Sequence, residues 1–516
     1  WDFVKMQLAT EFLGGTNLFK AFLMLSSGSV VGKIIGFLRE VLMAALFGTG
    51  TYVGAYRVAQ TAMLMPVELF LTNSLEAGFV PLYVRYAKDD PKRAQAFLSG
   101  VMMLFLLLAA AIFLFLLFGS FWWVGVLAPG MDVTSKVLTA SMLRVMALAV
   151  PLYILGMSLS YLEMAYGKYI AASFRSTVQS FGLIVGALLA FYLKVPVFLA
   201  WGFTWAYGAY LLWILARLWN SGILRWPAGL SWSLIKETLE AFWRCVRPVL
   251  FVPLLIQGDI AVERVVASLL GIGVIAALDY AKFITETGVI LVAAPLGMVG
   301  LSTLSGLDPD LVRQKVGQIA NVVLILTIPI SVFILYYHTS IINAIYARGA
   351  FDQESAAITA KILFGFSIGL WAQLLSYYFI RILNAQLRNI EVLLYISISI
   401  FLDIVIKLLL YEKLGPMILG LSFSMGSIVL FLFTTNALRL GRILHLSLLW
   451  MAIGTIFYIM LCSIVSHCLS IVSHLFYLVL AVGVFCLFWA LYMFLIPHLR
   501  VNIYLLVGKL HDLSDS

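Results

Sequence analysis

Residues 39–50 read REVLMAALFGTG, and residues 263–273 read ERVVASLLGIG. Each segment begins with an adjacent acid and base, continues as a mainly apolar run and ends in a Gly-x-Gly break. A tyrosine follows in both copies, Tyr56 in the first and Tyr280 in the second. Gly-x-Gly breaks between apolar helices also arise by chance, but the charged pair counts against that explanation. The two segments therefore indicate an internal repeat that divides the chain into two halves.

The composition places this repeat in a membrane. Hydrophobic residues make up 63% of the 516 residues and charged residues only 11%, whereas soluble domains carry about 25% charged residues. Apolar runs of roughly 20 residues, the length that crosses a hydrocarbon core of about 30 Å, recur along the chain. We therefore predict an all-α integral membrane protein with about fourteen transmembrane helices. The expected spans are 17–47, 54–84, 94–120, 135–165, 170–193, 196–219, 243–270, 273–304, 313–337, 354–383, 390–411, 416–439, 444–468 and 474–497.

Six spans precede each return of the repeated pattern, so the two copies have the same orientation. A parallel repeat of this kind places a substrate site between two lobes. We therefore expect two pseudo-symmetric six-helix lobes followed by two C-terminal helices. The predicted parts are an N-lobe at 1–219, a cytoplasmic interfacial linker at 220–242, a C-lobe at 243–440, two further helices at 441–498 and a cytoplasmic tail at 499–516.

The net charge is +9, and the basic residues are distributed as the expected topology predicts. Most Lys and Arg residues, Arg175 among them, fall in the termini and in alternate loops, and only about four (Lys136, Lys194, Arg348 and Lys413) fall in the opposite set. Cytoplasmic loops are the ones that carry this excess. Both termini are therefore predicted to be cytoplasmic, and the positive charge requires no nucleic-acid partner.

Charged residues also lie inside the first, second, seventh and eighth predicted helices. A charge at the bilayer centre costs about 2.5–3.5 kcal/mol on insertion scales, so these side chains must face something polar. One explanation is an internal salt bridge that holds the lobes together. The other is a hydrated cationic cavity for an anionic headgroup such as a pyrophosphate, to which arginine offers bidentate hydrogen bonds. The candidate substrate-binding residues are Lys33, Arg39, Glu40, Arg57, Arg264, Lys282 and Glu286.

A second polar set lies in the later helices. Asp259 and Asp403 are carboxylates within apolar spans, Ser399 lies one turn before Asp403, and Ser422 is in the next helix. Oxygen ligands of this kind suit Na⁺ or a proton relay, so the set is a candidate coupling-ion site. The alternative is that Lys407, four residues after Asp403, simply neutralises it.

Enzymatic chemistry is not indicated by any motif in the sequence. There is no P-loop, zincin signature or nucleophile elbow, and the four cysteines show no metal-ligand spacing. A transporter is the better interpretation, without a firm metal site or a cofactor.

Several short motifs follow one another in a characteristic order and spacing. They are Gly36-Phe-x-Arg39-Glu40, Phe47-Gly48-Thr-Gly50, Phe79-Val80-Pro81, Leu143-Arg144, Tyr280-Ala281, Arg348-Gly349-Ala350-Phe351 and Ser367-x-Gly369-Leu370. In this order the chain resembles the MurJ/MviN family of lipid II flippases, within the MOP/MATE-like superfamily of multidrug exporters and polysaccharide flippases. The match runs over most of the chain and includes the two extra C-terminal helices.

The resemblance implies a transporter of the bacterial inner membrane that works by alternating access. Its substrate would be an undecaprenyl-pyrophosphate-linked saccharide, moved from the cytoplasmic to the outer leaflet and driven by Na⁺, H⁺ or the membrane potential. Enzymes of cell-wall or polysaccharide synthesis are the implied partners. Lys33, Arg39 and Glu40 match charged residues that the family keeps in its first helix, and Asp259 and Asp403 fall where some members bind a coupling cation.

The chain departs from the family pattern in the second and eighth helices. Gly54 replaces an acid, Val67 and Glu68 replace paired arginines, and Lys282-Phe283 replaces an Asp-Arg pair. Arg57, Arg264 and Lys282 are the candidates for substitute charge. These departures leave open a capsule, O-antigen or exopolysaccharide repeat unit as the substrate. A cation-coupled multidrug exporter, which would need an acidic cavity, and a scaffold without transport remain further alternatives.

Overall fold

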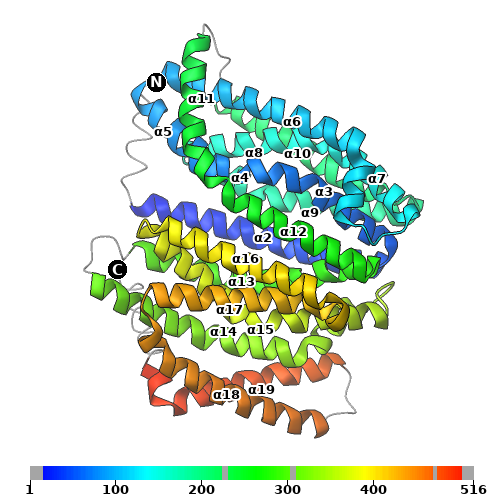
Figure 1. Cartoon of the computed structure of the whole chain (residues 1–516), viewed down its shortest axis with the longest axis vertical. Coiled ribbons are helices and arrows are strands. Elements are labelled where there is room, and N and C mark those ends of the chain that lie inside the picture. The colour runs from blue at the N-terminus through cyan, green and yellow to red at the C-terminus, as the bar shows by residue number, and fades with distance from the viewer. Residues whose placement is uncertain (1–14, 224–230, 303–308, 469–473, 502–516) are drawn as a thin grey trace. The chain divides into compact units, whose positions relative to one another are not determined.

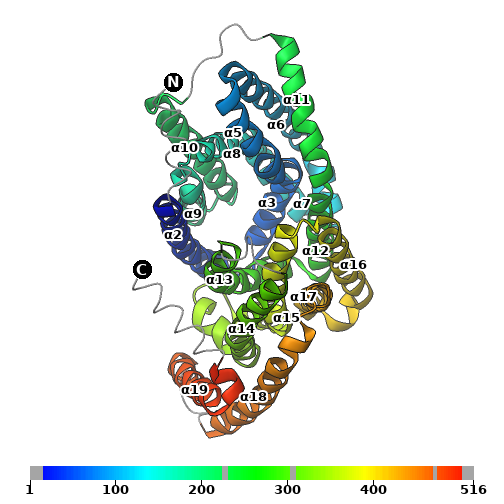
Figure 2. The same cartoon turned by 90° about the vertical axis from the view of Figure 1, so that its left-hand side faces the viewer.

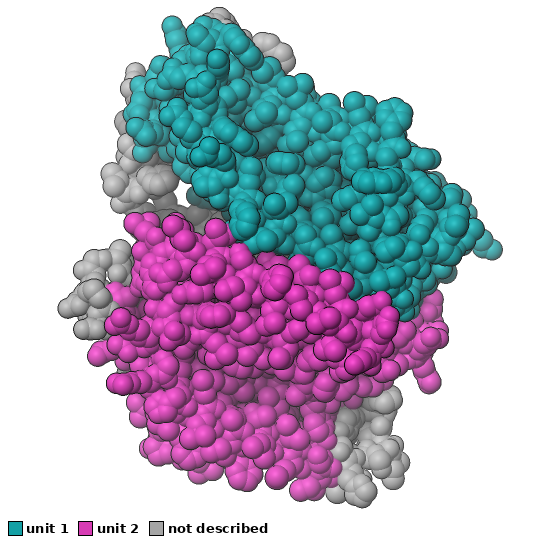
Figure 3. Space-filling model, in the orientation of Figure 1, with its two compact units in different colours: residues 1–276 teal, residues 277–516 magenta. Residues whose placement is uncertain are grey.

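The computed structural model describes residues 15–223, 231–302, 309–468 and 474–501, which form helices and no strand (Figure 1). The prediction of an all-α protein is confirmed. The chain divides into two compact units, residues 1–276 and 277–516, coloured separately in Figure 3. The predicted lobe boundaries stay a prediction. Most of the predicted tail and residues 224–230 of the predicted linker lie outside the described residues.

Unit 1 contains a helix, or a broken series of helices, for each of the first seven expected spans. These elements are α2 (Gly15–Phe47), α3 (Thr51–Phe70), α4 (Thr72–Ser74), the π-helical turn η1 (Leu75–Phe79), α5 (Val80–Asp89), α6 (Pro91–Leu127), α7 (Val133–Ala147), α8 (Ala149–Ala165), α9 (Ile170–Leu193), α10 (Phe198–Asn220), α11 (Trp232–Val246), the 3₁₀ turn η2 (Arg247–Val249) and α12 (Phe251–Leu270).

Prolines explain the breaks in this series. A proline lacks the N–H that would bond the carbonyl four residues earlier, so the helix bends or breaks there. The α7–α8 pair is bent by 43°, and α7 ends four residues before Pro151. The segments on either side of Leu250 are bent by 51°, and the first of them ends four residues before Pro253. Pro66 within α3 frees the carbonyl of Ala62, which accepts a hydrogen bond from the Trp123 indole at 3.0 Å.

The repeated Gly-x-Gly segments are helix ends in both copies. Gly48, which directly follows α2, has φ 59°, and Gly271, which directly follows α12, has φ 130°. Residues with a side chain rarely adopt such positive φ values, so glycine is required to stop the helix. The first glycine of each copy therefore lets the chain turn into the next helix.

Part of the predicted linker is a helix. Ser231 caps α11 by accepting a hydrogen bond from the backbone of Leu234. Phe242 on α11 is buried and contacts the rings of Phe97 and Phe105 on α6. The aromatic contacts hold α11 to α6, so the linker is packed against unit 1 from residue 232 onward.

Unit 2 contains most of α13 (Ile272–Ser302) and a helix for every remaining expected span. These are α14 (Pro309–Tyr346), α15 (Gln353–Ala385), α16 (Asn389–Leu414), α17 (Met417–Ala437), α18 (Gly441–Cys468) and α19 (His474–Leu495). The last two helices pack against α14 (Figure 2). α14 continues well beyond the expected end at residue 337, with non-helical torsion angles at Tyr337.

Nine helices of the described part of the chain are long and apolar enough to cross a membrane, or up to eleven when each bent pair is one span. The count of fourteen therefore stays a prediction. The helix α3, which is described in full, is not among the nine. It carries Arg57 and Glu68, and these charged side chains lower its hydropathy.

Close backbone contact joins α15 to α17 in unit 2. A Cβ atom added to Gly420 would lie 2.4 Å from the carbonyl oxygen of Ile362. Ser424 donates a hydrogen bond to the carbonyl of Gly365 at 2.6 Å and accepts one from the backbone N–H of Gly369 at 2.9 Å. Small residues allow helices to approach this closely in a membrane. Gly369 of the Ser367-x-Gly369-Leu370 motif therefore belongs to a packing seam.

We expect Gly420→Ala to lower the free energy of unfolding by about 1–3 kcal/mol, because the new methyl group overlaps backbone atoms that cannot rotate away. Thermal unfolding of the purified protein in detergent measures the change. Gly483→Ala in α19 is the matched control, since no atom lies within 4 Å of its added Cβ. An equal melting temperature for both variants would contradict the packing argument.

Candidate functional site

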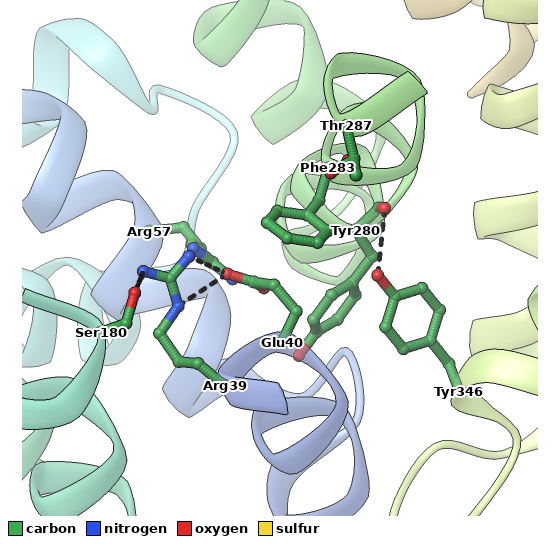
Figure 4. Close-up of polar contacts among 8 residues, drawn as sticks. All are labelled: Arg39, Glu40, Arg57, Ser180, Tyr280, Phe283, Thr287 and Tyr346. Carbon is green, nitrogen blue, oxygen red and sulfur yellow. Dashed lines mark hydrogen bonds and ion pairs between the residues drawn. The ribbon is translucent and has the colours of Figure 1, made fainter. Parts of the chain in front are cut away.

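A buried cluster of three charged residues joins α2 to α3 in unit 1 (Figure 4). Glu40 accepts hydrogen bonds from Arg39 Nε at 3.1 Å and Nη2 at 2.5 Å, and its other carboxylate oxygen accepts one from Arg57 Nη2. The side chains of Glu40 and Arg57 are only 2% and 7% exposed. The guanidinium of Arg39 also donates to Ser180 Oγ on α9 at 3.3 Å. The cluster thus links three helices of one unit.

Two guanidiniums meet a single carboxylate in this cluster. Arg39 keeps 15% of its side chain exposed, whereas Glu40 is saturated by its two neighbours. The salt-bridge alternative therefore accounts for Glu40, and the partly exposed guanidinium of Arg39 is the group of this cluster that is open to an anion.

The glycine-rich face of α2 brings this helix close to α9. A Cβ atom on Gly32 would lie 2.3 Å from Ser176 Oγ. Lys33 is the next residue and is half-buried. The close approach of the two helices explains why Ser180, one turn further along α9, reaches Arg39.

Arg264 on α12 is buried, and its guanidinium donates to the carbonyl of Ile275 at 3.4 Å. Ile275 lies in the first turns of α13, so this contact ties α13 back to α12 across the Gly271 turn. The neighbouring Glu263 is also buried. Both residues of the second copy's charged pair are thus buried, whereas in the first copy Glu40 is buried and Arg39 is half-buried.

Two candidate residues belong to unit 2. Lys282 is half-buried on α13 and Glu286 is exposed one turn further along. Nearby on the same helix, Tyr280 packs its ring 5.7 Å from Phe351, and its carbonyl accepts a hydrogen bond from Tyr346 Oη at 3.4 Å (Figure 4). Phe351 of the Arg348-Gly349-Ala350-Phe351 motif therefore supports α13.

The candidate coupling-ion residues divide between the units. Asp259 is half-buried on α12 in unit 1. Ser399, Asp403 and Ser422 are all buried at the contact of α16 with α17 in unit 2. Lys407 Nζ lies 2.9 Å from Asp403 Oδ2, so the predicted neutralising ion pair is formed.

The sequence interpretation missed a polar network around Glu68. Tyr153 Oη on α8 donates to Glu68, and the guanidinium of Arg175 donates to Tyr153 Oη at 3.0 Å. The count of basic residues placed Arg175 in a cytoplasmic loop, which is wrong, because it lies within α9. Its guanidinium supplies positive charge beside the position where paired arginines were expected. The signal was present, since residue 175 already fell inside the expected span 170–193.

Gly54 has a structural explanation. A Cβ atom at this position would lie 2.6 Å from the side chain of Ile272 and 2.8 Å from its carbonyl oxygen. An acidic side chain at residue 54 therefore does not fit in this chain, because the start of α3 packs directly on the start of α13. This contact accounts for the missing acid of the second helix.

A family model described as lipid II flippase MurJ matches residues 43–491. Among curated proteins, a probable lipid II flippase MurJ of Buchnera aphidicola subsp. Acyrthosiphon pisum (strain APS) is 23% identical over 492 residues, covering 88% of this chain and 91% of the relative. A probable lipid II flippase MurJ of Rhizobium tropici is 27% identical over 381 residues, covering 69% of this chain and 68% of the relative. The resemblance stated from the motifs is confirmed.

Solved structures show the same fold. A lipid II flippase MurJ in an inward closed conformation has a TM-score of 0.79 at 19% identity, covering 91% of this chain and 98% of that chain. An inward-facing multidrug resistance MATE family transporter of the MOP superfamily has a TM-score of 0.64 at 13% identity and covers 82% of this chain. The MOP/MATE-like fold is therefore confirmed. Because the family model spans most of its length, the chain belongs to the MurJ lipid II flippase family of multi-span helical membrane proteins.

Proposed function

We propose that this protein is a flippase that moves an undecaprenyl-pyrophosphate-linked saccharide, lipid II, from the cytoplasmic to the outer leaflet by alternating access. The observation that carries the proposal is the Arg39–Glu40–Arg57 cluster, where a buried carboxylate orients two guanidiniums and the guanidinium of Arg39 stays partly exposed. A pyrophosphate offers the oxygens that such a pair binds in bidentate fashion. Reversible binding of this kind, together with a switch of the protein between two conformations, moves the substrate without covalent chemistry.

The sign of the charge favours this substrate over a cationic drug. An exporter of cations needs acidic groups with spare charge, whereas Glu40 is saturated by its two arginines. The names of the curated relatives support lipid II over a capsule, O-antigen or exopolysaccharide repeat unit. The positive-inside distribution supports an inner-membrane location with both termini in the cytoplasm. Enzymes that make or use the glycan lipid are the proposed partners.

We expect the chain to restore growth in a bacterial strain depleted of its own lipid II flippase. Arg39→Ala is expected to abolish this rescue, because it removes the partly exposed guanidinium while Glu40 stays paired with Arg57. Arg39→Lys keeps the charge without the fork geometry and is expected to rescue weakly. Growth rate and protein level in the membrane are measured together.

Arg85→Ala is the matched control, since the Arg85 side chain is 77% exposed and pairs with Asp89 on its own helix. It should rescue like the parent chain. Full rescue by both Arg39→Ala and Arg264→Ala would remove the arginines of both repeat copies from the mechanism. Failure of the parent chain, despite normal accumulation, would point to a polymer-specific glycan instead.

A further inference from the structure

A buried polar seam runs between α16 and α17 in unit 2. Ser399, Asp403 and Lys407 recur every four residues on one face of α16, and they are 8%, 4% and 1% exposed. On α17, a Cβ atom at Gly426 would lie 3.0 Å from the carbonyl of Ser399 and 3.5 Å from Asp403 Cβ. Glycine at residue 426 therefore lets the two helices meet around the carboxylate.

Oxygen atoms with unused hydrogen-bonding capacity line this seam. Within the described part of the chain, Asp403 Oδ1 and Ser422 Oγ are buried and have no hydrogen-bond partner, and Ser422 lies one turn before Gly426 on α17. Ser399 donates to the carbonyl of Gly426 at 2.8 Å, so its oxygen lone pairs stay available. Carboxylate, hydroxyl and carbonyl oxygens are the ligands that hard cations such as Na⁺ prefer.

The ammonium group of Lys407 already lies among the oxygen atoms of this seam. Lys407 Nζ lies 2.9 Å from Asp403 Oδ2, at 1% exposure. A mobile cation on the same carboxylate would lie close to a buried ammonium and be repelled by it, with little water to screen the two charges. The residues present therefore do not fit the coupling cation that the family resemblance implies at Asp403.

In the middle of α16, the charged residues Asp403 and Lys407 lie on the packed face and large apolar side chains lie on the other faces. Leu394, Phe401, Leu408 and Leu409 on the other faces of α16 are 55%, 68%, 49% and 72% exposed. An intramembrane charge on the packed face, with its partner one turn away, is costly and marks a functional position more often than a structural one.

We propose that Lys407 is a tethered replacement for the coupling cation, so that the α16–α17 seam of this flippase is permanently loaded and needs no Na⁺. The inference rests on the proposed transport function and deepens it. It assigns a role to Lys407 that a plain helix salt bridge lacks, because removing the ammonium should convert the seam into a working Na⁺ site made of Asp403, Ser399 and Ser422.

Thermal unfolding of the purified full-length protein in detergent tests the proposal, with NaCl compared against choline chloride at equal ionic strength. The parent chain should melt at the same temperature in both salts. Lys407→Met, which keeps the length of the side chain without its charge, should melt several degrees lower in choline and regain stability with Na⁺ in a saturable way. Adding Asp403→Asn to that variant should abolish the response to Na⁺.

Lys413→Met is the matched control, since Lys413 is an exposed lysine in the last turn of the same helix. Saturable stabilisation of the parent chain by Na⁺ would overturn the proposal, and so would a folded Lys407→Met protein that ignores Na⁺. If Lys407→Met does not accumulate, Lys407→Gln replaces it, because the glutamine amide can still donate a hydrogen bond to Asp403. Its melting temperature is measured in the same two salts and interpreted in the same way. This readout involves no glycan lipid, so its failure is distinct from failure of the proposed flippase function.

Discussion

Glu40→Ala is expected to lower the free energy of unfolding by about 3–5 kcal/mol, the cost of leaving buried charges without their partner. Arg57 is 7% exposed on its side chain and would lose the carboxylate that compensates its charge in the low-dielectric interior. Arg39 would lose two hydrogen bonds, at 3.1 and 2.5 Å. The melting temperature of the purified protein and its level in the membrane both report this loss.

Removal of the second charge should restore part of the stability. The double variant Glu40→Ala with Arg57→Ala is expected to melt above the single variant, because the buried guanidinium that lost the Glu40 carboxylate is also removed. Glu237→Ala is the matched control, since Glu237 also pairs with an arginine but its side chain is 57% exposed; an exposed pair is worth about 0–1 kcal/mol. A Glu40→Ala protein as stable as Glu237→Ala would refute the compensating role of Glu40.

Gly54→Glu, which restores the acid usual for the family, is expected to prevent stable folding of unit 1. The added Cβ atom alone would lie 2.8 Å from the carbonyl oxygen of Ile272, so Gly54→Ala should already cost about 1–3 kcal/mol. Burial of an extra carboxylate adds several kcal/mol if no partner pays for its desolvation. The level of protein in the membrane and its melting temperature are the measurements.

Gly125→Ala provides the comparison for the steric part, because no atom lies within 4 Å of a Cβ atom added at that residue of α6. Its melting temperature should equal or exceed that of the parent chain. A Gly54→Glu protein that accumulates and supports growth would show that the start of α3 moves away from Ile272, and that the family acid is tolerated here.

Much of the fold could be predicted from the hydropathy of the sequence. Each expected span overlaps a helix or a broken series, since segments surrounded by lipid must satisfy their backbone groups internally. Prolines are visible in the sequence, so the breaks before Pro151 and Pro253 were predictable in principle. The hydrogen bond from the Trp123 indole to the Ala62 carbonyl, which replaces the bond lost at Pro66, could not be predicted, because Trp123 lies on another helix.

Only part of the candidate site could be predicted from the sequence, because its residues come from helices that are far apart in the chain. The cost of intramembrane charge identified Arg39, Glu40 and Arg57 without reference to their partners, and the structure pairs them. Arg175 was assigned to a loop because a count of basic residues by position contains no information on where a side chain points. Its contact with Tyr153 depends on the packing of α9 against α8.

By itself, the sequence determined that this protein is helical, spans a membrane and carries charges that must be compensated. Those properties follow from local composition, because the cost of placing each residue in lipid depends mainly on that residue. Only the tertiary structure decided which charges compensate one another: Arg57 and Arg39 on Glu40, and Lys407 on Asp403. It also decided why Gly54 is not an acid. Partner choice and steric fit are properties of pairs of segments, and they exist only when the helices are packed.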